Sequence, residues 1–243
     1  MDNIFPNWTA PANIGALTTT RSDGFSKSPF DSNNLGFHVG DVEEDVRQNR
    51  ERLRVGLSLP NEPAWLEQTH SNRCVVVEDE SLRTADAAVT RHPNYPLVIM
   101  TADCLPILLC NREGTEIAAV HSGWRGLADG IIENTLAKMH SSPSSLLAWV
   151  GPAICGSCYE VGDDVLQAYV RIYPRAEDGF LPHGERKLAN LPKIAEWVLN
   201  DLGISAVFQS NACTLEQKSN FYSYRREGQT GRMATLIWFK QDK

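Results

Sequence analysis

Short apolar runs recur along the chain and are separated by glycine, proline and polar residues. These runs are rich in valine, isoleucine, leucine and small residues, and their lengths are typical of buried strands. The strands that we expect cover residues 13–21, 63–70, 73–78, 96–100, 115–121, 146–151, 206–210 and 232–240.

Four other segments repeat apolar residues at the spacing of one helix face. Asp41 is a candidate N-cap for the first helix, Gly130 weakens the second, and Pro174 ends the third. In the fourth, Gly203 follows the last turn, where glycine commonly ends a helix. The helices that we expect cover residues 40–57, 124–139, 162–174 and 190–203.

The order of these elements predicts an α+β fold, because helices and strands are mixed without strict alternation. We expect a single domain over residues 1–243, with a mixed β-sheet core and helices packed outside it. The formal net charge of −7 argues against a general nucleic-acid binder and against a binder of anionic membranes. We find no export signal and no apolar run of about 18 residues, so we expect a cytoplasmic protein whose six cysteines are reduced.

Asp103 and Cys104 interrupt a long apolar run in the middle of the chain. Burying a carboxylate is costly unless it is paired or hydrogen-bonded. Pro106 cannot donate a strand hydrogen bond, so we expect the backbone to end or bend there, with Cys104 at a strand end. Two other expected strands end on His70 and His121. Two histidines and one cysteine are the ligand set of a catalytic zinc site with an open fourth position. A buried structural cysteine and two ordinary histidines are the alternative.

The same side chains allow a second interpretation that needs no metal. Cys104 would be a thiolate nucleophile, His121 its base, and Asp103 would orient a hydrogen-bond donor. Neighbouring side chains of a strand point to opposite faces, so Asp103 and Cys104 share a site only if the backbone turns between them.

A glycine-rich loop after the first expected strand carries Arg21, Asn34 and His38. Glycine lets the backbone approach a ligand closely, and Arg21 suits an anion such as phosphate. A solvated loop with an arginine in a surface salt bridge is the alternative. Arg125, in "HSGWRG", lies at the start of an expected helix, where free backbone N–H groups can bind an anion.

Tyr222, Tyr224, Arg225 and Arg226 precede the last expected strand. Paired arginines with tyrosines can hold an anionic or aromatic substrate, and they can equally form the rim of an ordinary hairpin.

The sequence "CGSC" contains a C-x-x-C motif at Cys155 and Cys158. A thioredoxin-like motif would follow a strand and open a helix, and half of a zinc site is another interpretation. Because the sequence offers no matching second half, we expect two unpaired thiols. The chain has no His-x-Glu, so it lacks the signature of zinc nucleobase deaminases.

Seven motifs that run in one order along nearly the whole chain resemble a known family. They are "TTTR…GFS…NNLGFHVGD", "WLEQTHS", "ADAAVT", "MTADCLPILL", "AAVHSGWRG", "GPAI…YEVG" and "FYSYRR…TGRMATLIW". The sequence is similar to the laccase-domain, or multicopper polyphenol oxidase, proteins. That family is also read as purine nucleoside phosphorylases and includes the bacterial peptidoglycan editing factor.

The resemblance implies one α+β domain with α/β/β/α-like layers and a zinc ion held by His70, Cys104 and His121. It also implies phosphorolysis of adenosine, inosine and 5′-methylthioadenosine, with adenosine deamination as a side activity and a role in editing peptidoglycan precursors. The substrates would be a purine nucleoside and phosphate, with no nucleic-acid or membrane partner. The resemblance carries over Arg21, Asn34 and His38 to the phosphate and ribose end of the site and Arg225 to its rim. Together with the candidates above, we expect the catalytic residues to be Arg21, Asn34, His38, Asp103 and Cys104. We expect the substrate-binding residues to be Gln68, Arg125, Tyr222 and Arg225. One departure is Asp23, which stands where the family usually has a glycine.

The older laccase name conflicts with the histidine content. A trinuclear copper centre needs many histidines, typically as His-x-His pairs, whereas this chain has six histidines and no such pair. Copper could still occupy the zinc site, because two histidines and a cysteine also suit copper. The alternatives are therefore a copper-dependent polyphenol oxidase, a Cys-His thiol hydrolase acting on amide bonds of murein precursors, and a non-catalytic binder of those precursors.

Overall fold

Six apolar strands form the central sheet in the order β11-β7-β5-β6-β3-β2. In this computed structural model, which describes residues 3–241, β11 runs parallel to β7 and β2 runs parallel to β3, whereas the other neighbours are antiparallel. The sheet is therefore mixed, as expected. Its strands are β2 (Cys74–Val76), β3 (Ala87–Thr90), β5 (Leu105–Asn111), β6 (Ile117–Ser122), β7 (Leu146–Val150) and β11 (Ala206–Gln209).

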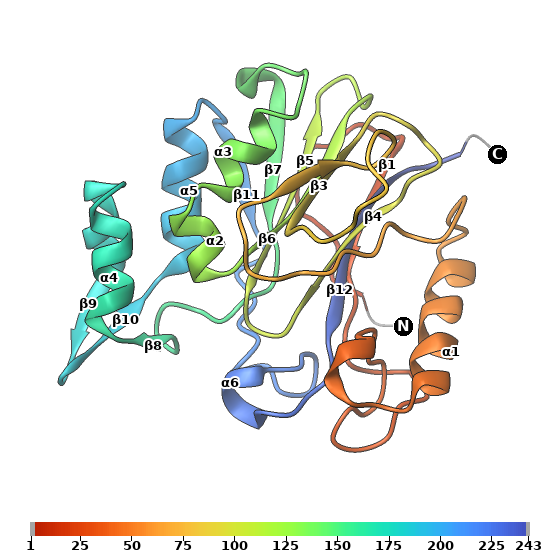
Figure 1. Ribbon diagram of the computed structural model, residues 1–243, viewed down its shortest axis with the longest axis horizontal. Helices are drawn as coiled ribbons and strands as arrows, with labels where there is room; N and C mark the ends of the chain where they lie inside the picture. The colour runs from red at the N-terminus through yellow and green to blue at the C-terminus, as the bar shows by residue number, and fades with distance from the viewer. Residues whose placement is uncertain (1–2, 242–243) are drawn as a thin grey trace.

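Both faces of this sheet are covered, which explains why its strands are apolar at successive positions rather than at alternate ones. Along β5, Ile107 and Leu109 belong to the core between the sheet and a group of helices, while Leu108 belongs to the core on the opposite face. The helices pack over one face (Figure 1) and are α2 (Trp124–Ala128), α3 (Ile131–Leu136), α4 (Asp163–Val170) and α5 (Leu191–Asp201).

A second, antiparallel sheet of three strands covers the other face of the central sheet (Figure 1). It consists of β1 (Ile14–Thr18), β12 (Met233–Phe239) and β4 (Leu97–Thr101). Leu97 and Ile99 of β4 pack against the central sheet, whereas Val98 faces outward toward Leu53 of α1 (Glu43–Gly56). The layers therefore follow the order helices, six-stranded sheet, three-stranded sheet and α1. This arrangement confirms the prediction of an α+β fold.

Smaller elements surround this stack of layers. They are a sheet of β8 (Glu160–Val161), β10 (Arg186–Ala189) and β9 (Phe180–His183), the 3-10 turns η1 (Phe37–Val39), η2 (Pro143–Ser145) and η3 (Pro174–Gly179), and helix α6 (Tyr224–Glu227). None of the helices within residues 3–241 is long and apolar enough to span a membrane.

The prediction of a strand over residues 63–70 is wrong. This segment makes only isolated bridges at Ala64 and Glu67. The backbone N–H groups of residues 69–71 instead bind the carboxylate of Asp86, at 3.2, 3.0 and 2.7 Å. Because a side chain satisfies these three donors, no neighbouring strand is needed for them.

Two expected helix details differ in the structure. The helix expected over 124–139 is broken into α2 and α3 at Gly130, whose φ of 83° is left-handed. Asp41 is not the N-cap of α1, because that helix begins at Glu43 after Val42. The Asp41 carboxylate instead accepts hydrogen bonds from the Val42 N–H and the Asn34 amide. Gly203 does follow α5 with a left-handed φ of 93°, as expected.

Candidate metal centre and substrate pocket

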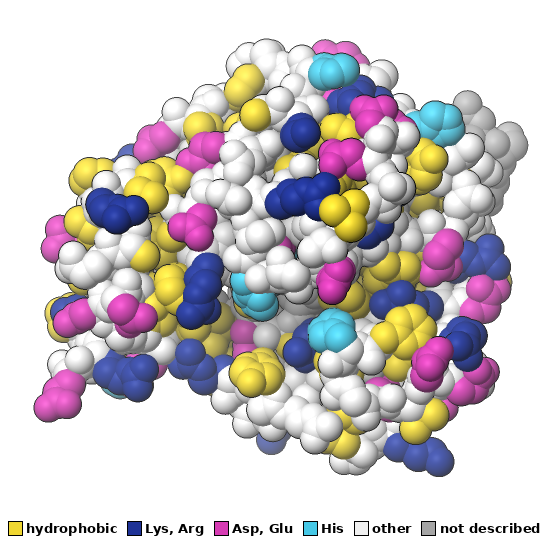
Figure 2. All heavy atoms as spheres, in the orientation of Figure 1, with side chains coloured by type: hydrophobic (Ala, Val, Ile, Leu, Met, Phe, Trp, Pro, Cys, Tyr) yellow, Lys and Arg dark blue, Asp and Glu magenta, His cyan; other side chains and the backbone are white. Residues whose placement is uncertain are grey.

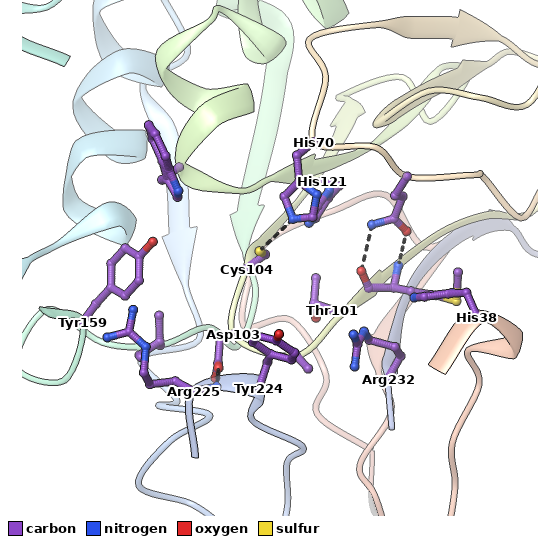
Figure 3. Close-up of a pocket in the computed structure, with 15 residues that line it drawn as sticks. His38, His70, Thr101, Asp103, Cys104, His121, Tyr159, Tyr224, Arg225 and Arg232 are labelled. Atoms are coloured by element: carbon purple, nitrogen blue, oxygen red, sulfur yellow. Dashed lines mark hydrogen bonds between the residues drawn. The ribbon is translucent and has the colours of Figure 1, made fainter. Parts of the chain in front are cut away.

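A pocket of about 530 Å³ opens where β4 ends and where β5 and β6 meet. This volume lies in the range of small-molecule sites. On the face shown in Figure 2, histidines and basic side chains gather around a hollow near the middle. The pocket is lined by His38, Gln68, His70, Met100, Thr101, Ala102, Asp103, Cys104, His121, Trp124, Ile154, Tyr159, Tyr224, Arg225 and Arg232 (Figure 3).

Three side chains in this pocket converge on one point. His70, Cys104 and His121 each offer one ligand atom, and these atoms lie within 4.8 Å of one another. The His70 Nε2 atom is 3.8 Å from the Cys104 Sγ atom, and the two imidazole rings meet edge to face with centroids 4.9 Å apart. His70 adopts a left-handed φ of 61°, an uncommon conformation for a side-chain-bearing residue.

The carboxylate of Asp86 holds this arrangement from behind. It is fully buried and lies 2.7 Å from the Nδ1 atom of His121. It also accepts the backbone N–H of His70 and both the N–H and the hydroxyl of Ser71. Burial by itself raises the pKa of Asp86, but the hydrogen bonds from His121 and Ser71 outweigh it and hold the pKa well below its ordinary value. One ionised side chain therefore orients two of the three converging residues.

Gly123 lets the backbone pass directly beside the three side chains. A Cβ atom added there would lie 3.0 Å from His70 Cδ2 and 3.3 Å from Cys104 Sγ. Any larger residue would crowd the point on which the ligand atoms converge. Close backbone approach thus explains the glycine of "HSGWRG".

Cys104 and His121 each shift the pKa of the other toward its charged form. Burial by itself would raise the pKa of Cys104, but hydrogen bonds and charge from His121 and His70 lower it to about 6. Burial would likewise lower the pKa of His121, whereas Asp86 and Cys104 raise it to about 9. A cysteine that is a thiolate at neutral pH is ready to bind a metal ion or to act as a nucleophile.

The donor set fits a metal ion. Two imidazoles and one thiolate suit zinc, with a fourth position left for a small ligand. A carboxylate hydrogen-bonded to the far nitrogen of a histidine is typical of metal ligands, because it fixes the tautomer and the ring. The three side chains line the cavity, so a metal ion held by them would face it.

Asp103 is saturated with hydrogen bonds. Its Oδ1 atom accepts from the Thr214 hydroxyl at 2.7 Å, and its Oδ2 atom accepts from the Ser223 hydroxyl at 3.0 Å and the Arg225 N–H at 2.7 Å. The residue has a left-handed φ of 96°, so the backbone does turn between β4 and β5. These bonds explain how the apolar run tolerates a carboxylate, and they join the turn at Cys104 to the start of α6, which carries Arg225.

A basic end of the pocket contains His38 and Arg232 (Figure 3). Burial, followed by the charges of Arg232 and Arg50, lowers the pKa of His38, so its imidazole is neutral at pH 7. Asn34 lies beneath this end rather than in the pocket. Its amide oxygen accepts the N–H groups of Gly36 and Arg232, both at 2.9 Å.

An aromatic end of the pocket contains Trp124 and Tyr159, whereas the Tyr224 ring lies toward the basic end, with its centroid 6.0 Å from the Arg232 guanidinium carbon. Arg225 lies over the Tyr159 ring, 5.1 Å from its centroid, and donates to the Glu160 carbonyl at 2.9 Å. Between the two ends, the buried hydroxyl of Thr101 has no hydrogen-bond partner within the described part of the chain. A ligand that fills the pocket could satisfy this hydroxyl.

Several residues that were expected to bind substrate have other contacts. Arg21 lies in a different surface hollow and pairs with Glu227 at 2.7 Å. Arg125 is exposed and lies over the Trp124 ring. Tyr222 is buried, and its hydroxyl donates to the Phe30 carbonyl at 2.5 Å.

Gln68 does line the pocket, but its amide is engaged in two hydrogen bonds. Its Nε2 atom donates to the Met100 carbonyl, and its Oε1 atom accepts the Met100 N–H, both at 2.8 Å (Figure 3, dashed lines). The structure therefore brings His38, Gln68, Asp103 and Arg225 to the pocket beside His70, Cys104 and His121, and it leaves Arg21, Asn34, Arg125 and Tyr222 outside.

Sequence reasoning missed four positions of the candidate site. Asp86 and Arg232 lie within two of the quoted motifs, "ADAAVT" and "TGRMATLIW", yet neither follows an expected strand as the histidines do. The other two positions are Trp124, which follows Gly123, and Tyr159, which follows Cys158. An aromatic residue next to a glycine or cysteine of a motif was the only sequence feature that could have indicated them.

The C-x-x-C motif is part of a second group of possible metal ligands. Cys155 and Cys158 meet Cys213 and Glu216, whose ligand atoms lie within 4.8 Å of theirs. The motif lies in a turn rather than at the start of a helix, so the thioredoxin-like context is not met.

Fold and site together define a layered α+β protein in which three candidate metal ligands line a pocket of small-molecule size. Residues 15–240 match the family described as "Multi-copper polyphenol oxidoreductase laccase", and the chain belongs to this family. A relative from Haemophilus influenzae, named purine nucleoside phosphorylase, is 45% identical over 99% of this chain and 100% of its own length. "Purine nucleoside phosphorylase YfiH" from Escherichia coli is 41% identical over 97% of this chain and 98% of its own length.

Solved structures agree with this assignment. A Neisseria meningitidis protein, NMB0706, superposes with a TM-score of 0.95 at 41% identity, covering 99% of this chain and 100% of its own. YlmD from Geobacillus stearothermophilus superposes with a TM-score of 0.88 at 29% identity, covering 98% and 100%.

Proposed function

We propose that this protein is a zinc-dependent purine nucleoside phosphorylase that converts adenosine, inosine and 5′-methylthioadenosine to a free base and a ribose 1-phosphate. The observation that carries the proposal is one pocket with a basic end, an aromatic end and a three-ligand metal centre. The names of the relatives support the same activity.

Phosphate would bind at the basic end. Arg232 offers a charged donor, and the neutral imidazole of His38 offers a neutral one. Asn34 would act as a positioning residue, because it accepts the backbone N–H of Arg232 and binds the loop that precedes His38. In this proposal Arg232 takes the role that the sequence suggested for Arg21.

The purine would lie at the aromatic end. Trp124 and Tyr159 offer ring faces and edges for a flat heterocycle. Arg225 is fixed above Tyr159 and presents charge to the same end. The ribose would then lie near the unpartnered hydroxyl of Thr101, which can bond a sugar hydroxyl.

The proposed reaction is a displacement at the ribose C1′ atom. An oxygen of hydrogen phosphate forms a bond to C1′ while the bond from C1′ to the purine N9 atom breaks. The electron pair of that bond goes to the purine, and the phosphate proton is transferred to it. Arg232 and His38 would hold the nucleophile in line, which removes much of the entropic barrier.

His70, Cys104 and His121 would hold the zinc ion, with His121 oriented by Asp86. Zinc supplies Lewis-acid stabilisation of negative charge that develops on the substrate. Asp103 would position Arg225 and the turn at Cys104 through its three hydrogen bonds. It is unsuited to proton transfer while both of its oxygens are engaged.

Two further activities belong to the proposal. Adenosine deamination, in which water replaces the 6-amino group as ammonia, could use the same metal centre. Editing of peptidoglycan precursors rests on the family resemblance alone. The six free cysteines fit a reducing compartment, so we propose the cytoplasm as the location.

The test is product analysis by mass spectrometry of purified zinc-loaded protein incubated with adenosine, with and without phosphate. We expect adenine and ribose 1-phosphate only when phosphate is present. Inosine alone would make deamination the main reaction. An absence of any adenosine turnover would contradict the proposal.

A thiol hydrolase that cleaves amide bonds of murein precursors is the second candidate. The thiolate-imidazolium pair of Cys104 and His121 favours it, because such pairs are typical of cysteine nucleophiles. A Cys-His pair does not need a second imidazole, however, and His70 converges on the same sulfur. A thiol hydrolase would survive chelation and be lost on alkylation, whereas the phosphorylase would be lost on chelation and regained with zinc.

A further inference from the structure

Two loops that follow parallel neighbouring strands of the central sheet meet beside the pocket. One loop follows β7 and carries Cys155 and Cys158, and the other follows β11 and carries Cys213. The loops are joined by the hydrogen bond from the Ala153 N–H to the Ala212 carbonyl and by that from the Thr214 N–H to the Ala153 carbonyl. Their cysteines are therefore held near one another by the sheet.

Four soft or anionic donors face one point between these loops. The sulfur atoms of Cys155, Cys158 and Cys213 and a carboxylate oxygen of Glu216 lie within 4.8 Å of one another. In a tetrahedral zinc site with ordinary bond lengths, two sulfur ligands lie about 3.8 Å apart. The observed spacing therefore needs only small side-chain movements to close around an ion.

Hydrogen-bonding groups lie next to two of the sulfur atoms. The Cys155 backbone N–H donates to Cys213 Sγ at 3.4 Å, and the Ser157 hydroxyl lies 3.0 Å from Cys155 Sγ. Hydrogen bonds to ligand atoms are typical of metal sites, where they orient the ligands. All three thiols are unpaired, so no disulfide competes for them.

We propose that Cys155, Cys158, Cys213 and Glu216 form a second metal site that binds zinc. Three thiolates favour zinc over hard cations such as magnesium or calcium. Four protein donors complete a tetrahedral shell, which is typical of a structural site rather than a catalytic one.

This site would stabilise one wall of the pocket. Ile154 and Tyr159, which flank the C-x-x-C motif on either side, both line the pocket. The Ile154 N–H donates to the Asp103 carbonyl, and the hydroxyl of Thr214, next to Cys213, donates to the Asp103 carboxylate. The four ligands would act as positioning residues, because none of them lines the pocket with the metal centre at Cys104.

The test separates the two metal sites by removing the first one. A variant with His70→Ala and Cys104→Ala, purified under reducing conditions, should retain one zinc ion per chain by elemental mass spectrometry. Adding Cys158→Ser should remove that ion. Cys74→Ala is the matched control, since Cys74 lies outside both clusters, and it should leave the zinc content unchanged. Because the catalytic ligands are absent, the result is independent of the proposed function.

Zinc that is missing from the His70→Ala, Cys104→Ala variant, or zinc that survives Cys158→Ser, would overturn the proposal. If the Cys158→Ser protein does not fold, Glu216→Gln changes an exposed side chain. It should weaken zinc binding at least roughly tenfold in competition with a chelator. Peptide mapping of the native protein offers a second readout. We expect Cys155, Cys158 and Cys213 to resist alkylation until a chelator is added, whereas a disulfide among them in zinc-loaded protein would contradict the site.

Discussion

The two groups of candidate metal ligands differ in what surrounds them. His70, Cys104 and His121 offer three donors, open on a cavity, and are backed by the buried carboxylate of Asp86. The cluster at Cys155 offers four donors in turns near the surface. An incomplete ligand shell with a rigid support suits chemistry, whereas a complete shell suits structure. The two clusters are therefore expected to differ in role because of the number of donor atoms and the buried carboxylate behind one of them, and not because of cysteine, which both contain.

The largest expected effect is the loss of one ligand from the open centre. Cys104→Ala should lower phosphate-dependent adenine formation roughly 1000-fold, because a metal ion contributes several kcal/mol to stabilising developing charge. Cys158→Ala should cause a much smaller loss and a lower melting temperature. Rates and thermal unfolding of both variants would be measured on the same preparations. Equal losses of activity would remove the distinction between the two centres.

The role of Asp86 in orienting the cluster of His70, Cys104 and His121 can be tested with Asp86→Asn. We expect zinc affinity to fall about 10- to 100-fold, because His121 loses the charge that fixes its tautomer. Competition with a chromogenic chelator measures this. Glu116→Gln is the matched control, since Glu116 is also buried but pairs with Arg91 away from the pocket. Unchanged affinity in Asp86→Asn would show that the carboxylate serves only the fold.

The pKa of Cys104 predicts how metal-free protein reacts with iodoacetamide. A thiol with a pKa of about 6 is mostly thiolate at pH 7, and its alkylation should fall only as the pH drops through 6. Cys74 and Cys110 provide internal controls, because burial raises the pKa of each to about 12 and keeps it protonated. Peptide mapping should show alkylation of Cys104 at least roughly tenfold faster than of these two at pH 7. Zinc should protect Cys104, and failure to protect it would place the metal elsewhere.

A smaller effect, on the KM for phosphate, distinguishes the roles of Arg232 and Arg21. Arg232→Met should raise the KM for phosphate about tenfold with little change in the KM for the nucleoside, because one charged donor is lost. Arg21→Met is the matched variant and should leave the phosphate KM unchanged, since Arg21 pairs with Glu227 in another hollow. A higher phosphate KM in Arg21→Met but not in Arg232→Met would place the phosphate site at Arg21, in the loop that the sequence first suggested.

Local patterns in the sequence predicted much of the fold and the core of the site. Apolar runs indicated most of the buried strands but not β3 and β5. Reactive residues after these runs drew attention to Cys104 and His121. The segment before His70 was assigned wrongly as a strand, because its N–H groups bind Asp86, which lies far away in sequence.

Long-range contacts were outside the reach of the sequence. Arg21 resembled a phosphate ligand until its partner Glu227 was known, and that pair is separated by most of the chain. The C-x-x-C motif looked incomplete for the same reason, because Cys213 joins it only through the pairing of β7 with β11.

The most direct test of the account is turnover measured as zinc is added back to metal-free protein. In Cys158→Ala, phosphate-dependent adenine formation should rise in proportion to zinc and stop at one ion per chain. Cys104→Ala should also bind one zinc ion per chain but remain inactive. Substantial turnover in zinc-loaded Cys104→Ala would contradict the central claim that the open centre of His70, Cys104 and His121 carries the reaction.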